Sequence, residues 1–212
     1  ARRHRHMCIR DRLTDSAGRV LPSVNLPLDI EADVAGLDDD PRIMRSVRGQ
    51  VAVASTVGQV RRVRIIPERP KANPETLQAL LDADMITLGP GSWFSSVLPH
   101  VLVPDIVEAI TSSDALRVIV LNLSSEPGET QGFSAERHLH VLAQHAPNLR
   151  VDRVIVDEES LPNESERVFV QRAASVLGAT AVFRDVRQVD EDGQVFNKHC
   201  PEKLAAVFNE LY

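Results

Sequence analysis

Short apolar runs alternate with amphipathic stretches along most of this 212-residue chain. The run Asp84–Leu88 is almost continuously apolar, and RVIVLNL (117–123), VDRVIVD (151–157) and TAVFRD (180–185) have the same character, which is typical of strands buried in a parallel sheet. Amphipathic segments separate them, at 103–113, 134–144 and 164–177. Because strands that alternate with helices form βαβ units, the pattern predicts an α/β fold with a mostly parallel sheet and helices on both faces.

Local sequence signals predict three further elements. Asn73 stands before Pro74, a cap followed by proline at the first helical position, and Leu77, Leu80 and Leu81 form an apolar stripe, so we expect a helix of about three turns. Upstream, GQVAVAS (49–55) and VRRVRIIP (60–67) surround a glycine-containing turn and predict a β-hairpin. The amphipathic end, PEKLAAVFNELY (201–212), predicts a last helix docked on the fold.

The composition narrows the class of protein. With 43% hydrophobic and 25% charged residues, the chain is in the ordinary globular range. Residues 1–17 begin with a basic cluster that lacks apolar periodicity, so we expect a disordered or non-native segment there and exclude it from the fold. One α/β domain is expected over residues 18–212. No apolar run approaches the ~18 to 20 residues of a membrane span, and the first residues show no signal-peptide pattern. We therefore expect a cytoplasmic protein without a membrane span.

The net charge is −6, and it is −10 once residues 1–12, with five arginines and one aspartate, are set aside. This balance argues against nucleic acid as the main partner. Cys8 and Cys200 lie far apart in unlike contexts, so we expect free thiols rather than a disulfide or a zinc site.

The most informative junction is LGPGSWFSS (88–96), where a predicted strand ends and a helix begins. Gly89, Gly91 and Ser92 lie where unpaired N–H groups and a positive helix dipole converge, which suits a phosphate. Ser92, Ser95 and Ser96 add hydroxyl donors. A tight turn that simply requires glycine is the alternative, since this is neither a Walker loop nor a GxGxxG motif.

A second polar loop, NLSSEPGETQGFS (122–134), follows the next predicted strand. Ligands of open α/β sheets bind at the carboxyl edge of the strands, so Asn122, Glu129 and Thr130 are candidates to hold a sugar or ribose. A solvated loop is the alternative. Lys198 and His199 flank the start of the last predicted helix, where a cation can reach a diphosphate; a solvent-facing pair is the simpler interpretation.

We predict no metal site. His138, His140 and His145 lie on one predicted helix, but we identify no Cys, Glu or Asp at matching spacing, and the apolar residues among them indicate an ordinary amphipathic helix. The acidic residues Asp38, Asp39 and Asp40, with Asp29, Glu31 and Asp33 nearby, could bind a cation, although acidic surface loops usually only solvate.

Taken together, the runs VRGQVAVAS, ADMITLGPGSWFSSVLPHVLVPDI, NLSSEPGETQGFSAERHLHVL and KHCPEKLA resemble the YvcK branch of the CofD-like family, over roughly Gly18 to Leu211. The resemblance implies a Rossmann-like fold that binds UDP-N-acetylglucosamine, in a non-catalytic regulator of cell shape, cell-wall precursor supply and gluconeogenic growth. No cofactor is implied, the regulatory partner protein is unknown, and we expect a homo-oligomer.

The resemblance also assigns residues. Gly89, Gly91, Ser92 and Ser95 would meet the diphosphate, Asn122 and Glu129 would line the cleft, and Lys198 stands where an arginine is usual, which keeps the charge but loses the bidentate fork. Cys200 replaces an aspartate. The family's opening glycine loop and DDGGS-like turn have no counterpart here, so we expect an N-terminally truncated sheet that lacks its first strand or strands.

The other branch of the family provides the competing interpretation. Its members transfer a 2-phospho-L-lactate group to a deazaflavin cofactor precursor, in a metal-assisted reaction that would require Mg²⁺ and acidic residues near the glycine turn. No such acids lie immediately beside LGPGSWFSS.

Overall fold

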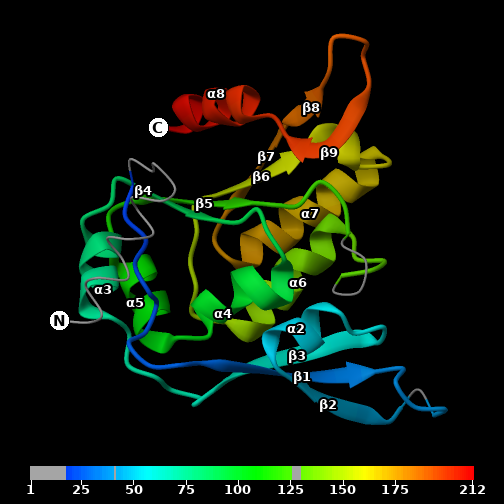
Figure 1. Cartoon of the computed structure of the whole chain (residues 1–212). Coiled ribbons are helices and arrows are strands. Elements are labelled where there is room, and N and C mark those ends of the chain that lie inside the picture. The colour runs from blue at the N-terminus through cyan, green and yellow to red at the C-terminus, as the bar shows by residue number, and fades with distance from the viewer. Residues whose placement is uncertain (1–17, 41, 126–129) are drawn as a thin grey trace.

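A four-stranded parallel sheet forms the centre of the protein, as the apolar runs predict. The computed structural model describes residues 18–40, 42–125 and 130–212, so the expected basic segment 1–17 lies outside the described residues. The sheet contains, in spatial order, β4 (Met85–Leu88), β5 (Leu116–Val120), β6 (Arg153–Asp157) and β7 (Thr180–Arg184). All three pairings are parallel, which confirms the mixed α/β class with a parallel sheet (Figure 1).

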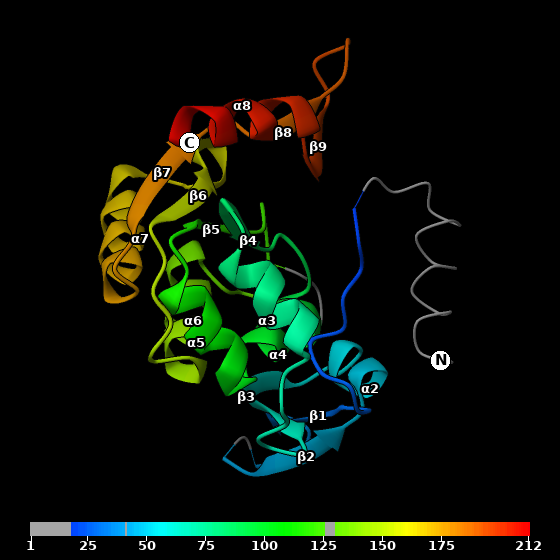
Figure 2. The same cartoon turned by 90° about the vertical axis from the view of Figure 1, so that its left-hand side faces the viewer.

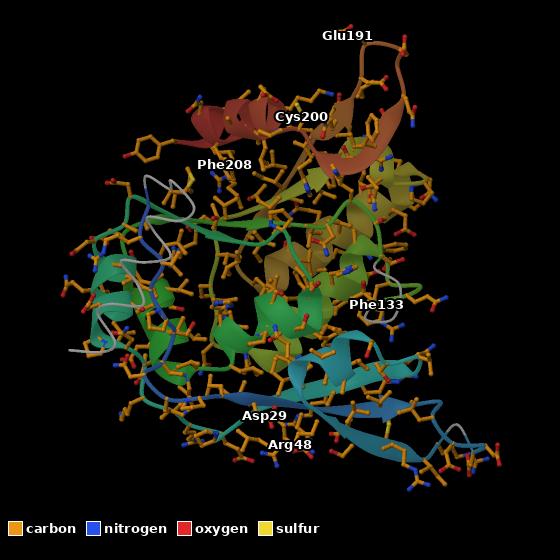
Figure 3. The ribbon with its side chains drawn as sticks, viewed as in Figure 1. Asp29, Arg48, Phe133, Glu191, Cys200 and Phe208 are labelled. Carbon is orange, nitrogen blue, oxygen red and sulfur yellow. The ribbon has the colours of Figure 1, made fainter. Side chains whose placement is uncertain are left out.

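Alternate residues of the central strands face two separate apolar clusters. Val118, Val120 and Ile155 pack against the last helix, α8 (Pro201–Leu211), and Figure 3 shows Phe208 on the side of that helix nearest the sheet. Ile119 and Val154 belong to the larger cluster on the opposite face. Helices therefore cover both faces, as predicted, and the amphipathic C-terminal segment docks where its pattern requires.

Two helices of the other face begin at capping residues that the sequence reveals. Asn73 accepts a hydrogen bond from Glu75 N at the start of α3, and Ser134 accepts one from Arg137 N at the start of α6. The helices of this face are α3 (Pro74–Leu81), α4 (Leu98–Val101), α5 (Pro104–Ser112), α6 (Ala135–His145) and α7 (Glu164–Val176), with a short 3₁₀ turn, η2 (Glu158–Ser160), before α7. The prediction of three turns for α3 was wrong, because the helix ends after eight residues, where the chain turns toward β4.

The predicted hairpin over residues 49–67 was also wrong. Its first half forms a short helix, α2 (Gln50–Ala54), entered through Gly49 at φ 101°. Its second half, β3 (Gln59–Ile66), instead pairs with β1 (Asp29–Ala35), which also pairs with β2 (Met44–Arg48) in an antiparallel sheet of order β2-β1-β3. A glutamine followed by two valine-alanine pairs fits one helical turn as well as a strand, so tertiary pairing decided between them.

The two sheets lie at opposite ends of the larger core, and helices α4, α5 and α6 lie between them in both views (Figures 1 and 2). A hairpin, β8 (Arg187–Val189) and β9 (Val195–His199), precedes α8. In the described residues no single helix is long and apolar enough to span a bilayer; Trp93–Val101 and Pro104–Ser112 together satisfy that measure but bend by 72° at their junction.

Candidate functional site

The glycine turn after β4 is built against the end of β5. Gly89 has φ 79°, and a Cβ placed there would lie 2.6 Å from the Val120 carbonyl oxygen, so both the backbone angle and the close approach require glycine. Asn122 holds the next glycine: its Oδ1 accepts from Gly91 N and its Nδ2 donates to Gly91 O, each at 3.0 Å. The expectation of an unpaired N–H at Gly91 was therefore wrong, because the Asn122 side chain satisfies it.

The helical segment after the turn is η1 (Trp93–Val97), a π-type turn with Ser92 as its N-cap. The Ser92 carbonyl oxygen accepts from both Ser96 N and Val97 N, which confirms that a helix begins where the sequence indicates. Ser95, expected to offer its hydroxyl to a ligand, is instead only 8% exposed, because η1 turns it toward the core. Its carbonyl oxygen accepts from Gln50 Nε2 of α2.

A hollow of about 320 Å³ lies at the carboxyl edge of β5, between the glycine turn and the β8–β9 hairpin. Its sheet wall consists of Pro90, Gly91, Asn122, Leu123 and Ser124, and its hairpin wall consists of Asn197, Lys198 and His199. The structure thus brings together Gly91, Asn122, Lys198 and His199, four residues that the sequence singled out in three separate segments. Figure 3 marks Cys200, the residue after this wall, at the start of α8.

Buried charge supports the hairpin wall from behind. Asp157, at the end of β6, is 2% exposed; its Oδ2 accepts from Arg187 Nε at 2.8 Å and its Oδ1 accepts from Val186 N at 3.2 Å. Arg187 pairs with His199 across the hairpin. The carboxylate of Asp157 therefore anchors the strand whose partner carries Lys198.

Direct contacts also join the two walls. Asn197 Nδ2 donates to Ser124 Oγ at 2.8 Å, and His199 Nε2 lies 3.2 Å from the Leu121 carbonyl oxygen. A carbonyl only accepts, so Nε2 carries the hydrogen. Burial lowers the pKa of His199 despite this hydrogen bond, which favours the neutral ring. The ammonium of exposed Lys198 is then the cationic group of the wall.

The remaining candidates lie elsewhere. Gly89 and Ser96 line a neighbouring, mostly apolar hollow of about 390 Å³, which shares Pro90 with the first. Thr130 is fully buried, so its expected contact with a sugar is not supported by its position. Glu129 lies outside the described residues. Ser92 is half-buried at the start of η1 and is not part of either described lining.

The histidines of α6 have structural contacts. His138 Nδ1 and His145 Nδ1 each donate to the carbonyl oxygen four residues earlier, and His145 Nε2 accepts from Val63 N of β3. The statement that these histidines lack an acidic partner at helical spacing was wrong for His140, whose Nε2 lies 3.1 Å from Glu136 Oε1. Within the described residues, no group of three potential ligands is placed to hold a metal ion.

Four of the six acidic residues near the start of the fold pair with arginines. Asp29 pairs with Arg48, as the outer face of the antiparallel sheet in Figure 3 shows, and Asp38 pairs with Arg45. Arg64 contacts both Glu31 and Asp33, at 3.1 and 3.0 Å. These carboxylates therefore neutralise neighbouring guanidinium groups on the surface.

Sequence reasoning missed Ser124, Asn197 and Asp157. Asp157 ends β6, and Asn122 lies just beyond the end of β5, so the rule that placed Asn122 at the carboxyl edge of the sheet could also have found Asp157. No motif in the neighbouring sequence identifies Asn197 as a site residue. Together the walls present carboxamide groups, a hydroxyl and an ammonium, and none of the described residues that line the hollow carries a carboxylate. Such a set suits an anionic ligand that also has hydroxyl groups.

Comparisons with known proteins agree with this architecture. The sequence model of the family described as "2-phospho-L-lactate transferase CofD" matches residues 8–196. A solved structure of a UPF0052-family protein from Bacillus halodurans matches with a TM-score of 0.74 and 25% sequence identity, over 94% of this chain and 65% of that one.

Curated relatives have a different name. A Mycobacterium tuberculosis (strain CDC 1551 / Oshkosh) protein named "Putative gluconeogenesis factor" is 51% identical over 198 residues, 93% of this chain and 56% of the relative. The Bacillus subtilis (strain 168) "Gluconeogenesis factor" is 32% identical over 157 residues, 74% of this chain and 47% of the relative. The chain thus spans about half the length of these relatives.

Proposed function

The chain belongs to the CofD family, and on that premise we propose that it binds a nucleotide sugar, UDP-N-acetylglucosamine, as a regulatory ligand. The observation that carries the proposal is the hollow between the sheet wall and the hairpin wall, which joins Gly91, Asn122 and Lys198 from three segments far apart in the chain. The protein would act in the cytoplasm, without catalysis, on cell shape, cell-wall precursor supply and gluconeogenic growth.

The chemistry of the walls supports this ligand. A diphosphate needs N–H, O–H or ammonium donors and an absence of nearby carboxylates, and the described lining satisfies both needs. The ammonium of Lys198 would contact the diphosphate, while Ser124 and Asn197, which are hydrogen-bonded to each other, would contact sugar hydroxyl or amide groups. The volume of about 320 Å³ lies at the lower end of the range of ligand sites, so the ligand would extend beyond it toward the solvent.

The names of the relatives support the regulatory branch. The mycobacterial and Bacillus subtilis proteins are both named as gluconeogenesis factors. A regulator needs an output, which we assign to a partner protein of unknown identity. We also propose that the chain forms a homo-oligomer. The second candidate is phospholactyl transfer to a deazaflavin precursor with Mg²⁺, after the description of the matched family; the names of the curated relatives do not favour it.

Calorimetric titration of UDP-N-acetylglucosamine into the protein tests the first proposal. We expect saturable binding that weakens about tenfold or more in Lys198→Ala, because a charge-assisted contact to phosphate is lost. Lys203→Ala is the matched control: it removes a nearby lysine that pairs with Asp185 and is not part of the described lining. Ser92→Ala tests whether the start of η1 also contributes to ligand binding. Competition with UDP-glucose tests whether the protein recognises the N-acetyl group.

No heat from the folded wild type, with circular dichroism confirming the fold, would contradict the sensor proposal. Equal weakening in Lys198→Ala and Lys203→Ala would instead contradict the placement of the diphosphate. Turnover of a nucleotide-activated lactate in the presence of Mg²⁺ and a deazaflavin precursor would favour the transferase.

A further inference from the structure

Two complementary polar atoms are buried just behind the glycine turn. In the described part of the chain, Trp93 Nε1 and His138 Nε2 are buried side-chain atoms without a hydrogen-bond partner. Trp93 is 0% exposed and His138 is 4% exposed. Buried polar atoms are nearly always hydrogen-bonded, because an unmade bond is costly away from water. The two unpaired atoms of Trp93 and His138 therefore require a physical explanation.

One atom of the pair is a donor and the other is an acceptor. The indole Nε1–H of Trp93 can only donate. His138 Nδ1 lies 2.8 Å from the Ser134 carbonyl oxygen, so Nδ1 carries the hydrogen and Nε2 presents a lone pair. Burial lowers the pKa of His138, which keeps this ring neutral. The two rings meet edge to face with centroids 5.2 Å apart, so the unpaired donor and the unpaired acceptor belong to side chains that contact each other.

The two residues belong to the helical elements that follow the two segments of the sheet wall along the chain. Trp93 is the first residue of η1, two positions after Gly91 of the sheet wall. His138 lies in the first half of α6, the helix that follows the loop beginning at Asn122. Phe133, labelled in Figure 3, packs on His138 with ring centroids 5.4 Å apart and so helps to hold the contact together. A π-type segment such as η1 is frequent at functional sites.

We propose that Trp93 and His138 are positioning residues that couple the glycine turn to α6 through one hydrogen bond, from Trp93 Nε1–H to His138 Nε2, direct or through a single water. The inference deepens the proposed function and rests on it, since the ligand concerned is the nucleotide sugar. The bond holds η1 against α6 and so fixes the glycine turn, which carries Gly91 of the sheet wall, relative to α6. By linkage, a ligand that prefers this arrangement strengthens the bond, and the bond strengthens ligand binding.

Variants that preserve ring shape separate this role from simple packing. His138→Phe removes the acceptor but keeps an aromatic ring, so we expect UDP-N-acetylglucosamine to bind about tenfold more weakly. The free energy of unfolding should also fall, because the buried Trp93 Nε1–H and the Ser134 carbonyl oxygen each lose a partner. Trp93→Phe removes the donor, and the double variant should be no weaker than either single one. His140→Phe, at an exposed position of the same helix, is the matched control and should bind as the wild type does. Wild-type affinity in His138→Phe, or losses that multiply in the double variant, would overturn the coupling.

A spectroscopic test does not depend on the ligand. Trp93 is the only tryptophan, so the ¹⁵N-labelled protein gives one indole N–H resonance. We expect its hydrogen exchange to be slower in the wild type, and in the conservative variant His138→Gln, than in His138→Phe, because the first two retain an acceptor. Equal exchange in wild type and His138→Phe overturns the bond. If the wild type binds no UDP-N-acetylglucosamine, the proposed function fails, and this resonance still decides whether the bond exists.

Discussion

The two walls of the hollow are held in place in different ways. Backbone geometry fixes the sheet wall: Gly89 fits against the Val120 carbonyl and the Asn122 carboxamide pairs with both backbone atoms of Gly91. Side chains from distant elements hold the hairpin wall, through Asp157 with Arg187 and through Asn197 with Ser124. A rigid wall therefore faces one whose position depends on a few polar contacts, and changes to each wall should have separable effects.

The largest effect is expected at Gly89. In Gly89→Ala the new Cβ would meet the Val120 carbonyl oxygen at 2.6 Å at a positive φ, so we expect a loss of about 3–5 kcal/mol in the free energy of unfolding. Gly132→Ala is a matched control, since Gly132 has φ 75° and no neighbour within 4 Å, and should lose only about 1 kcal/mol. Urea denaturation measures both. Equal losses would mean that the contact with β5 does not fix the sheet wall.

The next effect falls on the hairpin wall. The side chain of Asp157 is fully buried and its charge holds Arg187 in place. Asp157→Asn removes this charge, so we expect the free energy of unfolding to fall by about 2–3 kcal/mol. Glu210→Gln breaks the exposed pair with Arg184 and should lose less than about 1 kcal/mol. Hydrogen exchange sharpens the comparison: amides of β8 and β9 should exchange faster in Asp157→Asn, while those of β4 and β5 should not. Uniform acceleration would show that the two walls do not respond separately.

Acidification should lower the free energy of unfolding through three histidines that are buried or half-buried. Burial lowers the pKa of His138, His145 and His199 below the ordinary value of 6.5, so the unfolded chain takes up protons first as the pH falls. The contribution of these neutral histidines to the free energy of unfolding is fully present above pH 6.5. It declines as the pH falls from there through the lowered pKa values. For His138 alone the slope is about 1 kcal/mol per pH unit within that window. Unfolding at pH 7.5 and 5.5 measures it, and His138→Phe should flatten the dependence; an unchanged slope in that variant would contradict this assignment.

The smallest effect concerns the contact that joins the walls. Ser124→Ala removes the acceptor of Asn197 Nδ2 at an exposed position, so we expect a loss of about 0.5–1 kcal/mol. Ser125→Ala, at the next position of the same loop, serves as the reference. Urea denaturation and calorimetry with UDP-N-acetylglucosamine should both reveal the change. An effect of Ser124→Ala as large as that of Asp157→Asn would mean that this contact, rather than the buried carboxylate, positions the hairpin wall.

The sheet wall was largely predictable from sequence because its determinants are local. Apolar runs specified β4 and β5, Asn73 and Ser134 marked helix starts, and Gly-Pro-Gly-Ser marked the turn. The partner of Gly91 was not predictable, because the side chain that pairs with it lies 31 residues away in sequence.

The rest required tertiary information. Strand β1 was not predicted, although Ile30, Ala32 and Val34 alternate with acidic residues. The acidic positions were interpreted as a possible cation site or a solvated loop instead. Helix α2 was assigned as a strand because five residues cannot establish a period. In the hairpin wall the sequence indicated Lys198 and His199, but not Asp157 or Asn197, whose roles depend on contacts with segments 30 and 73 residues away.

The central claim is that both walls meet one ligand, and a ¹H–¹⁵N titration of the protein with UDP-N-acetylglucosamine tests it most directly. We predict that the amide signals of Gly91 and Asn122 in the sheet wall and of Lys198 and His199 in the hairpin wall shift together, with a single dissociation constant. Shifts confined to one wall, or found instead in the separate hollow that Arg61, Arg62 and Gln144 help to line, would contradict the account.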